Sequence, residues 1–241
     1  EAVGKQDQVY TVGMGMYGGG PESIADGKLN ASWELFPAEL GQIAGQAVAD
    51  LQAGKDVPAS ISTDMVFVTS ENIGEFLDVS DSEETTEESF LVGYSAAGLI
   101  DELQVTWSEG VDESIAAAGG EVVIVDSQND IAKQVSDIED LLIQGIDYLV
   151  INPVDEAGIV PAIEAANEAG IPVITIDRGA AGGEVAVHVG FDNYKAGYDA
   201  CEYIADMTGG VGEVAQLEGQ AGTSVARERG DGFRDCVEQY P

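Results

Sequence analysis

Positively charged residues are scarce in this sequence. Its 241 residues contain 9 Lys and Arg against 45 Asp and Glu, which gives a formal net charge of −36 at pH 7. A protein with this charge repels phosphate backbones and anionic lipid surfaces, so nucleic acids and acidic membranes are excluded as expected partners. Because salt screens the self-repulsion, we predict a protein from a salt-loving organism. An ordinary acidic secreted protein is the alternative.

Long apolar runs and cysteine clusters are also missing. No stretch approaches the roughly 20 apolar residues of a membrane-spanning helix, which predicts no insertion into a bilayer. Cys201 and Cys236 are too few for a disulfide framework or a structural zinc site. Each falls in a predicted helix, where a small buried hydrophobic residue is the favoured interpretation and a disulfide between the two is the alternative.

Residues for catalysis and cofactor binding are equally scarce. His188 is the only histidine and lies in a strand pattern, so we expect a buried or hydrogen-bonded imidazole and no catalytic triad. Residues 13–18 match G-x-G-x-x-G, but Pro21 and a short helix replace the crossover helix that dinucleotide binding needs. Residues 218–230 lack the Gly-Lys-Ser/Thr of a phosphate loop. We therefore predict no cofactor, no metal and no enzyme. A nucleotide-dependent enzyme on a doubly wound fold is a less favoured alternative.

Short β-branched runs alternate with helical stretches from Phe90 onward. The helical stretches follow a 3.6-residue period and end near glycines, as helix C-termini commonly do. This alternation predicts an α/β fold with a doubly wound parallel sheet covered on both faces. The predicted strands are Phe90–Ser95, Glu121–Asp126, Asp147–Asn152, Ile171–Asp177, Glu184–Val189 and Gly212–Leu217. The predicted helices are about Glu102–Ala118, Ile131–Gln144, Glu156–Ala169, Tyr194–Met207 and Ser224–Gln239.

The first 76 residues follow a different pattern and predict a partial second α/β lobe. Strands are expected at Gln8–Met14, Leu29–Leu35 and Ile61–Thr69, and helices at Pro21–Asp26 and Ala38–Gln52. Residues 77–89, LDVSDSEETTEES, are acidic and hydroxylated with almost no apolar content, which predicts a solvated linker. The predicted parts are therefore the partial lobe at 1–76, the linker at 77–89 and a complete α/β lobe at 90–241.

The carboxyl ends of the strands are where a sheet of this kind binds ligands. Asp177 and Arg178 lie at the end of one predicted strand, and an acceptor beside a donor suits a ligand rich in hydroxyl groups. An ion pair that closes the loop is the alternative. Arg227 and Arg229 are two positions apart on a predicted helix, so they point to different faces and one of them can face the crevice.

Several stretches of the chain from Phe90 to Gln239 carry a family resemblance. They are VDSQND at 125–130, the run at 149–178 that ends in ITIDR, Phe-Asp-Asn at 191–193, and LEGQAGTSVARERGDGFRDCV at 217–237. With these motifs the chain resembles the ribose and galactose class of periplasmic sugar-binding proteins of ABC transporters, whose fold is shared with LacI-type effector domains. The resemblance implies that Asp177, Arg178 and Arg229 hold sugar hydroxyl groups.

Further candidates come from the first loop and from two aromatic residues. In the family the first loop, here around 95–104, contributes contacts, which adds Ser95, Asp101 and Gln104. This loop lacks the aromatic pair of ribose binders, and its shape, with NASWELFP at 30–37, is closer to galactofuranose-type or other sugar-binding members. Tyr17 and Trp33 are core residues by default, with stacking on a sugar ring as the alternative.

Residues 1–76 resemble the end of the second lobe of the same family, so the C-terminal part of the family precedes the N-terminal part. The family's usual Asp and Gln align with Gly15 and Leu35, and the first βα units of the second lobe have no counterpart. We favour a fragment of a tandem array as the explanation. A circular permutant with a deletion and an engineered fusion are the alternatives.

The resemblance implies capture of a monosaccharide or related polyol between two lobes and its delivery to an ABC transporter permease. The expected location is periplasmic or extracellular, and the linker resembles the acidic spacer after a lipoprotein anchor, which adds a lipid anchor as a hypothesis. The alternative is the effector-sensing domain of a LacI-type regulator, although the acidic linker stands where its DNA-binding helices would be. Because the second lobe is incomplete, we predict weakened or undetectable sugar affinity.

Overall fold

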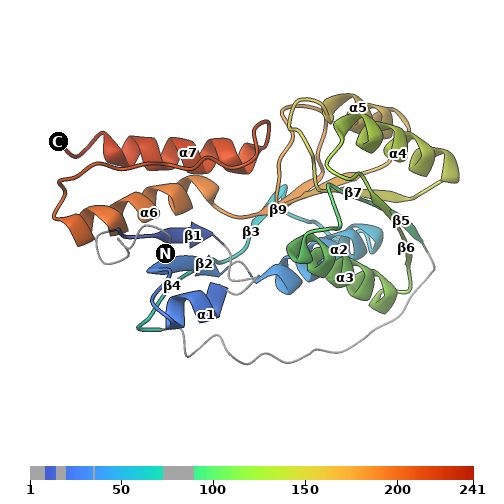
Figure 1. Cartoon of the computed structure of the whole chain (residues 1–241). Helices are drawn as coiled ribbons and strands as arrows, with labels where there is room; N and C mark the ends of the chain where they lie inside the picture. Colours follow the sequence, from blue (N-terminus) through green and yellow to red (C-terminus); the bar gives the residue numbers. More distant parts are fainter. Residues whose placement is uncertain (1–8, 15–19, 35, 73–89) are drawn as a thin grey trace.

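The structure is a computed structural model that describes residues 9–14, 20–34, 36–72 and 90–241 (Figure 1). The predicted linker at 77–89 lies outside these residues. The described residues form a larger body around a six-stranded sheet and a smaller body around a three-stranded sheet. Within this part of the chain, no helix combines the length and apolar character needed to cross a membrane.

The larger body is built on a wholly parallel sheet with the strand order β3-β9-β8-β7-β5-β6. The strands are β3 (Ser60–Ser62), β5 (Leu91–Ala96), β6 (Glu121–Asp126), β7 (Tyr148–Ile151), β8 (Val173–Ile176) and β9 (Val187–Gly190). Every residue of β7 and β8 is buried, which explains their nearly continuous apolar sequences. The predicted α/β fold with a parallel sheet is confirmed.

Two helices cover each face of the larger sheet. They are α2 (Pro37–Gln52) and α3 (Glu102–Ala117) on one face, and α4 (Ile131–Gln144) and α5 (Val160–Glu168) on the other. Neighbouring residues of β7 enter different cores: Val150 packs with α2 and α3, whereas Leu149 packs with α4 and α5. This alternation makes the sheet apolar on both faces and accounts for the doubly wound arrangement.

The smaller body combines the short sheet with three helices. Its elements are β1 (Val12–Met14), β2 (Ala31–Glu34), β4 (Val66–Thr69), α1 (Gly20–Ala25), α6 (Asn193–Thr208) and α7 (Ser224–Val237). β1 pairs in parallel with β2, which pairs antiparallel with β4. The Phe67 ring packs against Trp33 on one side and Tyr203 on the other, with ring centroids 4.9 and 5.0 Å apart. These contacts hold α6 against the sheet.

The packed bodies do not follow the predicted domain boundaries. Residues 37–62 contribute α2 and β3 to the larger body, while α6 and α7, within the predicted lobe at 90–241, lie with the smaller sheet (Figure 1). Glycines allow α2 to approach α3 closely, since a Cβ atom at Gly41 would lie 2.4 Å from the Trp107 carbonyl oxygen. Packing of the helix faces, rather than proximity in sequence, decides this division.

Two strand predictions need correction. The run predicted as one strand at Ile61–Thr69 divides into β3 and β4, which belong to different sheets. Residues 212–217 are not a strand and pair with no other described residues. Their β-branched pattern needs a neighbouring backbone to bond, and Leu217 is instead 97% exposed. The other predicted strands and helices are present, with bounds that differ by a few residues.

Candidate functional site

Two polar residues meet where the strands β7 and β8 end. Asn152 follows β7 and Asp177 follows β8, and both side chains are buried. The Asn152 side-chain amide donates a hydrogen bond to the Ile176 carbonyl oxygen at 2.9 Å. The Asp177 backbone N–H donates to the Val189 carbonyl oxygen at 2.8 Å, with Asp177 in the left-handed region at φ 59°. Bonds to neighbouring strands therefore hold this rim in place.

Arg178 folds back over the same edge of the sheet. Its Nε lies 3.9 Å from a carboxylate oxygen of Asp177, which is an ion pair without a hydrogen bond. Its terminal nitrogens donate to the Pro153 carbonyl oxygen at 3.2 Å and to the Gln220 side chain at 3.4 Å. The loop-closing ion pair considered from sequence is thus present, but it leaves the donor capacity of Nε unused among the described residues.

Arg229 reaches this rim from α7 of the smaller body. Its Nε donates to the Asn193 side-chain oxygen at 2.7 Å, at the start of α6. Burial raises the pKa of the Asp177 carboxyl, and the charges of Arg229 and Arg178 oppose that effect. Arg178 pairs with Asp177, and Arg229 lines the same cavity as Arg178, so the structure brings the three side chains to one edge of the sheet. That they hold a ligand stays a prediction.

Three buried polar atoms at this rim lack a hydrogen-bond partner in the described part of the chain. They are the Tyr94 hydroxyl, the Asn152 side-chain oxygen and Arg178 Nε. Burial raises the pKa of Tyr94, and the negative charge of Asp177 raises it further, so the phenol stays protonated. Each unsatisfied buried group costs about 1–3 kcal/mol. Together with the Asp177 carboxylate, they offer donors and acceptors that a hydroxylated ligand can satisfy.

A cavity of about 760 Å³ opens beside the rim, and Arg178 and Arg229 form part of its wall. The rest of the wall comes from β1, α6, α7 and residues 215–220, and includes Ala200, Ile204 and Phe233. This volume lies within the range of about 300–1,000 Å³ that is usual for small-molecule sites. The wall also contains Glu218 and Gln220, so it combines apolar surface with charged and amide groups that can bind a ligand with polar edges.

Four other predicted site residues do not join the rim in the same way. Ser95 is buried. Its hydroxyl oxygen lies 3.4 Å from the Ser127 hydroxyl oxygen and accepts a hydrogen bond from the Gln134 side-chain amide at 3.2 Å. Gln104 is also buried, and its side chain accepts from the Gly98 N–H at 2.8 Å. Trp33 is a core residue, and Tyr17 lies outside the described residues. Interior hydrogen bonds therefore correct the expectation that Ser95 and Gln104 face a ligand, whereas Trp33 has the core position that the sequence favoured over stacking on a sugar.

Asp101 has a mixed outcome. Its side chain caps α3 by accepting from the Leu103 N–H at 3.0 Å, a role typical of aspartate at this position. Burial lowers the pKa of Arg178, and the negative charge of Asp101 opposes this decrease. The same charge adds to the increase that burial causes in the pKa of Asp177, so Asp101 acts electrostatically on the rim. Helix capping is the role that its contacts establish.

Asn152, Asn193 and Tyr94 are not among the residues predicted singly from the sequence. The two asparagines lie in the segments 152–155 and 191–193, which are candidate strand ends in the sequence, and an amide directly after a fully apolar strand points to Asn152 in particular. Tyr94 gave no such signal, because an aromatic residue inside a buried strand is usually core. Only the position of its hydroxyl near Asp177 sets it apart.

His188 has the hydrogen-bonded position that the sequence predicted. It lies in β9, where its Nδ1 is 2.9 Å from the Thr175 hydroxyl, and burial lowers the pKa of its imidazole. Since the unfolded chain takes up the proton first, stability is lost as the pH falls below the ordinary value near 6.5. We expect the melting temperature to fall between pH 7 and 5.5, and to fall less in His188→Gln. As the chain has one histidine, NMR titration of its ring protons measures the pKa directly, and a value above 6.5 would contradict the prediction.

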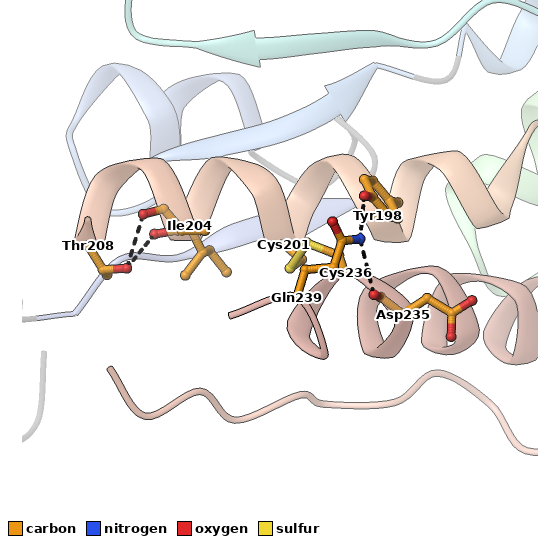
Figure 2. Close-up of a disulfide and its surroundings, with 8 residues drawn as sticks. Tyr198, Cys201, Ile204, Thr208, Asp235, Cys236 and Gln239 are labelled. Atoms are coloured by element: carbon orange, nitrogen blue, oxygen red, sulfur yellow. Dashed lines mark hydrogen bonds between the residues drawn. A yellow bond between two sulfur atoms is a disulfide. The ribbon is translucent and has the colours of Figure 1, made fainter. Parts of the chain in front are cut away.

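The cysteines form a disulfide, Cys201–Cys236, which corrects the favoured interpretation of two separate thiols (Figure 2). The bond joins α6 to α7, and its Cα atoms are 6.0 Å apart. Beside it the Gln239 amide donates to the Tyr198 hydroxyl at 2.6 Å and to the Asp235 carbonyl oxygen at 3.3 Å (Figure 2). The helix that carries Arg229 is thus fastened to the helix that carries Asn193. Among the described residues, no group of His, Cys, Asp and Glu could hold a metal ion.

Comparison with known proteins gives a consistent family. The family model described as periplasmic binding protein domain matches residues 92–241. The ribose import binding protein RbsB of Bacillus subtilis (strain 168) is 44% identical over 153 residues, which cover 64% of this chain and 50% of the relative. The chain therefore spans about half the length of the relatives that it matches.

Solved structures give the same picture. An ABC transporter solute binding protein from Mycobacterium smegmatis with bound glycerol is 37% identical, with a TM-score of 0.59 over 62% of this chain and 52% of the other. The periplasmic binding protein of the arabinose ABC transporter from Shewanella sp. ANA-3, bound to L-arabinofuranose, is 27% identical, with a TM-score of 0.59 over 63% and 51%. These relatives are solute-binding proteins and not enzymes.

Proposed function

The chain belongs to the periplasmic binding protein domain family, and on this premise we propose that it binds a monosaccharide or related polyol for uptake by an ABC transporter. One relative is named a ribose import binding protein, and the two solved structures contain bound glycerol and bound L-arabinofuranose. All of these ligands are small and carry several hydroxyl groups. No covalent step is proposed, because binding and release are sufficient for solute capture.

The observation that carries this proposal is the buried Asp177 carboxyl with the half-buried Arg178 and Arg229 and three unpaired polar atoms beside it. A sugar hydroxyl can donate to the Asp177 carboxylate and accept from a guanidinium at the same time. The left-over donor at Arg178 Nε and the acceptor at Asn152 would then gain partners. Charge-assisted bonds of this kind contribute about 1.5–3 kcal/mol each.

We further propose that this chain binds sugar weakly. Two positions that hold polar contacts in the resembling family are Gly15 and Leu35 here, neither of which has a side chain able to hydrogen-bond. The smaller body also has only a three-stranded sheet in the part that the structure describes. Losing two hydrogen bonds to a ligand lowers the affinity by about 10-fold or more.

The proposed setting is the periplasm or cell exterior, in line with the family. A permease partner and a lipid anchor are parts of this proposal that rest on the resemblance alone. A salt-rich surrounding fits the net charge of −36, since ions screen repulsion within the surface. The tandem-array origin of the reversed order of segments likewise stays a proposal.

We expect sugars to shift NMR signals around the rim at millimolar concentration. Backbone amides of Asp177, Arg178 and Arg229 should move when pentoses, hexoses and polyols are screened in molar salt. Asp177→Asn keeps the shape of the side chain but removes its charge, and should weaken binding by about 10- to 100-fold, which abolishes the shifts. Asp206→Asn is the matched control, because Asp206 is exposed on α6, away from the rim.

Three outcomes would contradict the proposal. The first is binding of ATP or NAD without any response to sugars, which would favour a nucleotide-dependent protein. The second is sugar-induced shifts that persist unchanged in Asp177→Asn. Micromolar sugar affinity in the unaltered chain would overturn the claim of weak binding, while leaving the sugar site itself in place.

A further inference from the structure

Three contacts join the smaller body to the larger one beside the proposed site. The backbone N–H of Glu156 donates to the Gly222 carbonyl oxygen at 2.8 Å. The backbone N–H of Gly179 donates to the Ser224 hydroxyl at 2.8 Å. The Arg227 guanidinium pairs with the Glu156 carboxylate. None of these groups belongs to the set of Asp177, Arg178 and Arg229, so the bodies are linked by more than the binding residues.

The pair between Arg227 and Glu156 has a two-point geometry. Arg227 Nε donates to one carboxylate oxygen at 3.2 Å, and its terminal nitrogen donates to the other at 3.0 Å. Two parallel bonds of this type fix orientation as well as distance. Glu228 also accepts from Arg227 at 3.3 Å. In a chain with 9 Lys and Arg against 45 acids, this contact uses one of few available cations.

Glycine at position 222 permits the close approach. Gly222 has φ 87°, in the left-handed region, and a Cβ atom there would lie 2.2 Å from a carboxylate oxygen of Asp155. The segment that precedes α7 therefore meets the loop after β7 backbone to backbone. In Figure 1 the N-terminal end of α7 points toward the loops that follow β7 and β8.

Both partners are tied in sequence to the proposed site. Glu156 lies in the loop that begins with Asn152, and Arg227 precedes Arg229 by two residues on α7. A movement of one body against the other that separates Glu156 from Arg227 also moves Arg229 relative to Asp177. The contact can therefore control the site without touching a ligand.

We propose that Glu156 and Arg227 form a closure contact, which holds the two bodies together and sets the position of Arg229 relative to Asp177. The proposal rests on the proposed function for its effect on sugar, whereas the contact itself involves none of the proposed binding residues. Arg227 and Glu156 are positioning residues. Losing their ion pair should favour an open arrangement and speed the release of bound sugar, while every group that contacts the sugar remains.

The test uses charge reversal in the full chain. Arg227→Glu places a third carboxylate beside Glu156 and Glu228, so we expect a larger radius of gyration in small-angle X-ray scattering without sugar. Sugar release, measured by NMR line shape, should be up to about 5-fold faster. The double variant Arg227→Glu with Glu156→Arg restores the pair with its charges exchanged, and should return both values to those of the unaltered chain.

Arg234→Glu is the matched control. It makes the same change in net charge on the same helix, but Arg234 pairs with Glu218 and Asp231 inside the smaller body. If Arg227→Glu and Arg234→Glu give the same radius of gyration, the closure contact is overturned. Should Arg227→Glu fail to fold by circular dichroism, Glu156→Gln breaks the same pair from the larger body, with the same expected and contrary results. A compact Arg227→Glu with Asp177-dependent sugar binding refutes only the closure. An expanded Arg227→Glu together with no sugar binding by the unaltered chain refutes only the proposed function.

Discussion

Replacement of Cys201 and Cys236 by serine is expected to lower the free energy of unfolding by about 4 kcal/mol. The disulfide closes a loop across a sequence separation of 35 residues, and the chain-entropy relation for a loop of that length gives this value. For a chain of this size the melting temperature should fall by about 10 °C. Differential scanning calorimetry of the oxidised chain and of the double variant measures the difference.

Reduction gives an independent check on the disulfide. Dithiothreitol should lower the melting temperature of the unaltered chain to nearly that of the double serine variant, and should leave the variant unchanged. Because both cysteines are buried, the reductant reaches the disulfide only as the chain unfolds. Dithiothreitol must therefore be present throughout the scan of the unaltered chain. A melting temperature that reductant does not move, together with two thiols detected after unfolding without reductant, would show that the bond does not form.

The pairing of the cysteines illustrates where sequence reasoning stops. The periodicity of residues 194–207 and 224–239 predicts two helices, and both are present as α6 and α7. The helical periodicity of neither segment indicates that the two helices cross at Cys201 and Cys236. That crossing depends on three-dimensional packing, which the apolar face of each helix permits but does not specify.

Strand positions show the same division between local and distant causes. The buried strands β7 and β8 could be predicted because a strand covered on both faces is apolar throughout. The run at 212–217 has the same local character, yet it forms no strand, because strand formation needs a neighbour with unpaired backbone groups. A pattern within one segment does not report whether that neighbour exists.

The candidate site follows this rule as well. Asp177 and Arg178 could be placed because the ends of parallel strands share one edge of a sheet. Ser95 lies near the end of β5 and Gln104 in the first turn of α3, but hydrogen bonds with Gln134 and Gly98 direct their side chains inward. Sequence therefore locates the edge, whereas the competition between interior and ligand hydrogen bonds selects its residues.

Gly197→Ala is expected to destabilise the pair of helices α6 and α7 by about 2–3 kcal/mol, although alanine is the better helix former. A Cβ atom at Gly197 would lie 2.0 Å from the Arg229 carbonyl oxygen, and one at Gly232 would lie 2.0 Å from the Tyr194 carbonyl oxygen. Helix propensity alone predicts a gain of about 1 kcal/mol. We expect the steric clash to outweigh the gain in helix propensity, because the obstacle is rigid backbone and the disulfide resists separation of the helices. Thermal and urea unfolding measure the net change.

Gly197→Ala should also displace Arg229, since the added Cβ atom would clash with the carbonyl oxygen of Arg229. Sugar-induced NMR shifts should then weaken together with stability, in contrast to Cys201→Ser with Cys236→Ser, which removes a constraint but adds no bulk at the crossing. Gly212→Ala is the control, because a Cβ atom there meets nothing within 4 Å. A Gly197→Ala chain as stable as the control would mean that the helices lie farther apart than described. The position of Arg229 relative to Asp177 would then lose its structural basis, because that position depends on how closely α7 packs on α6.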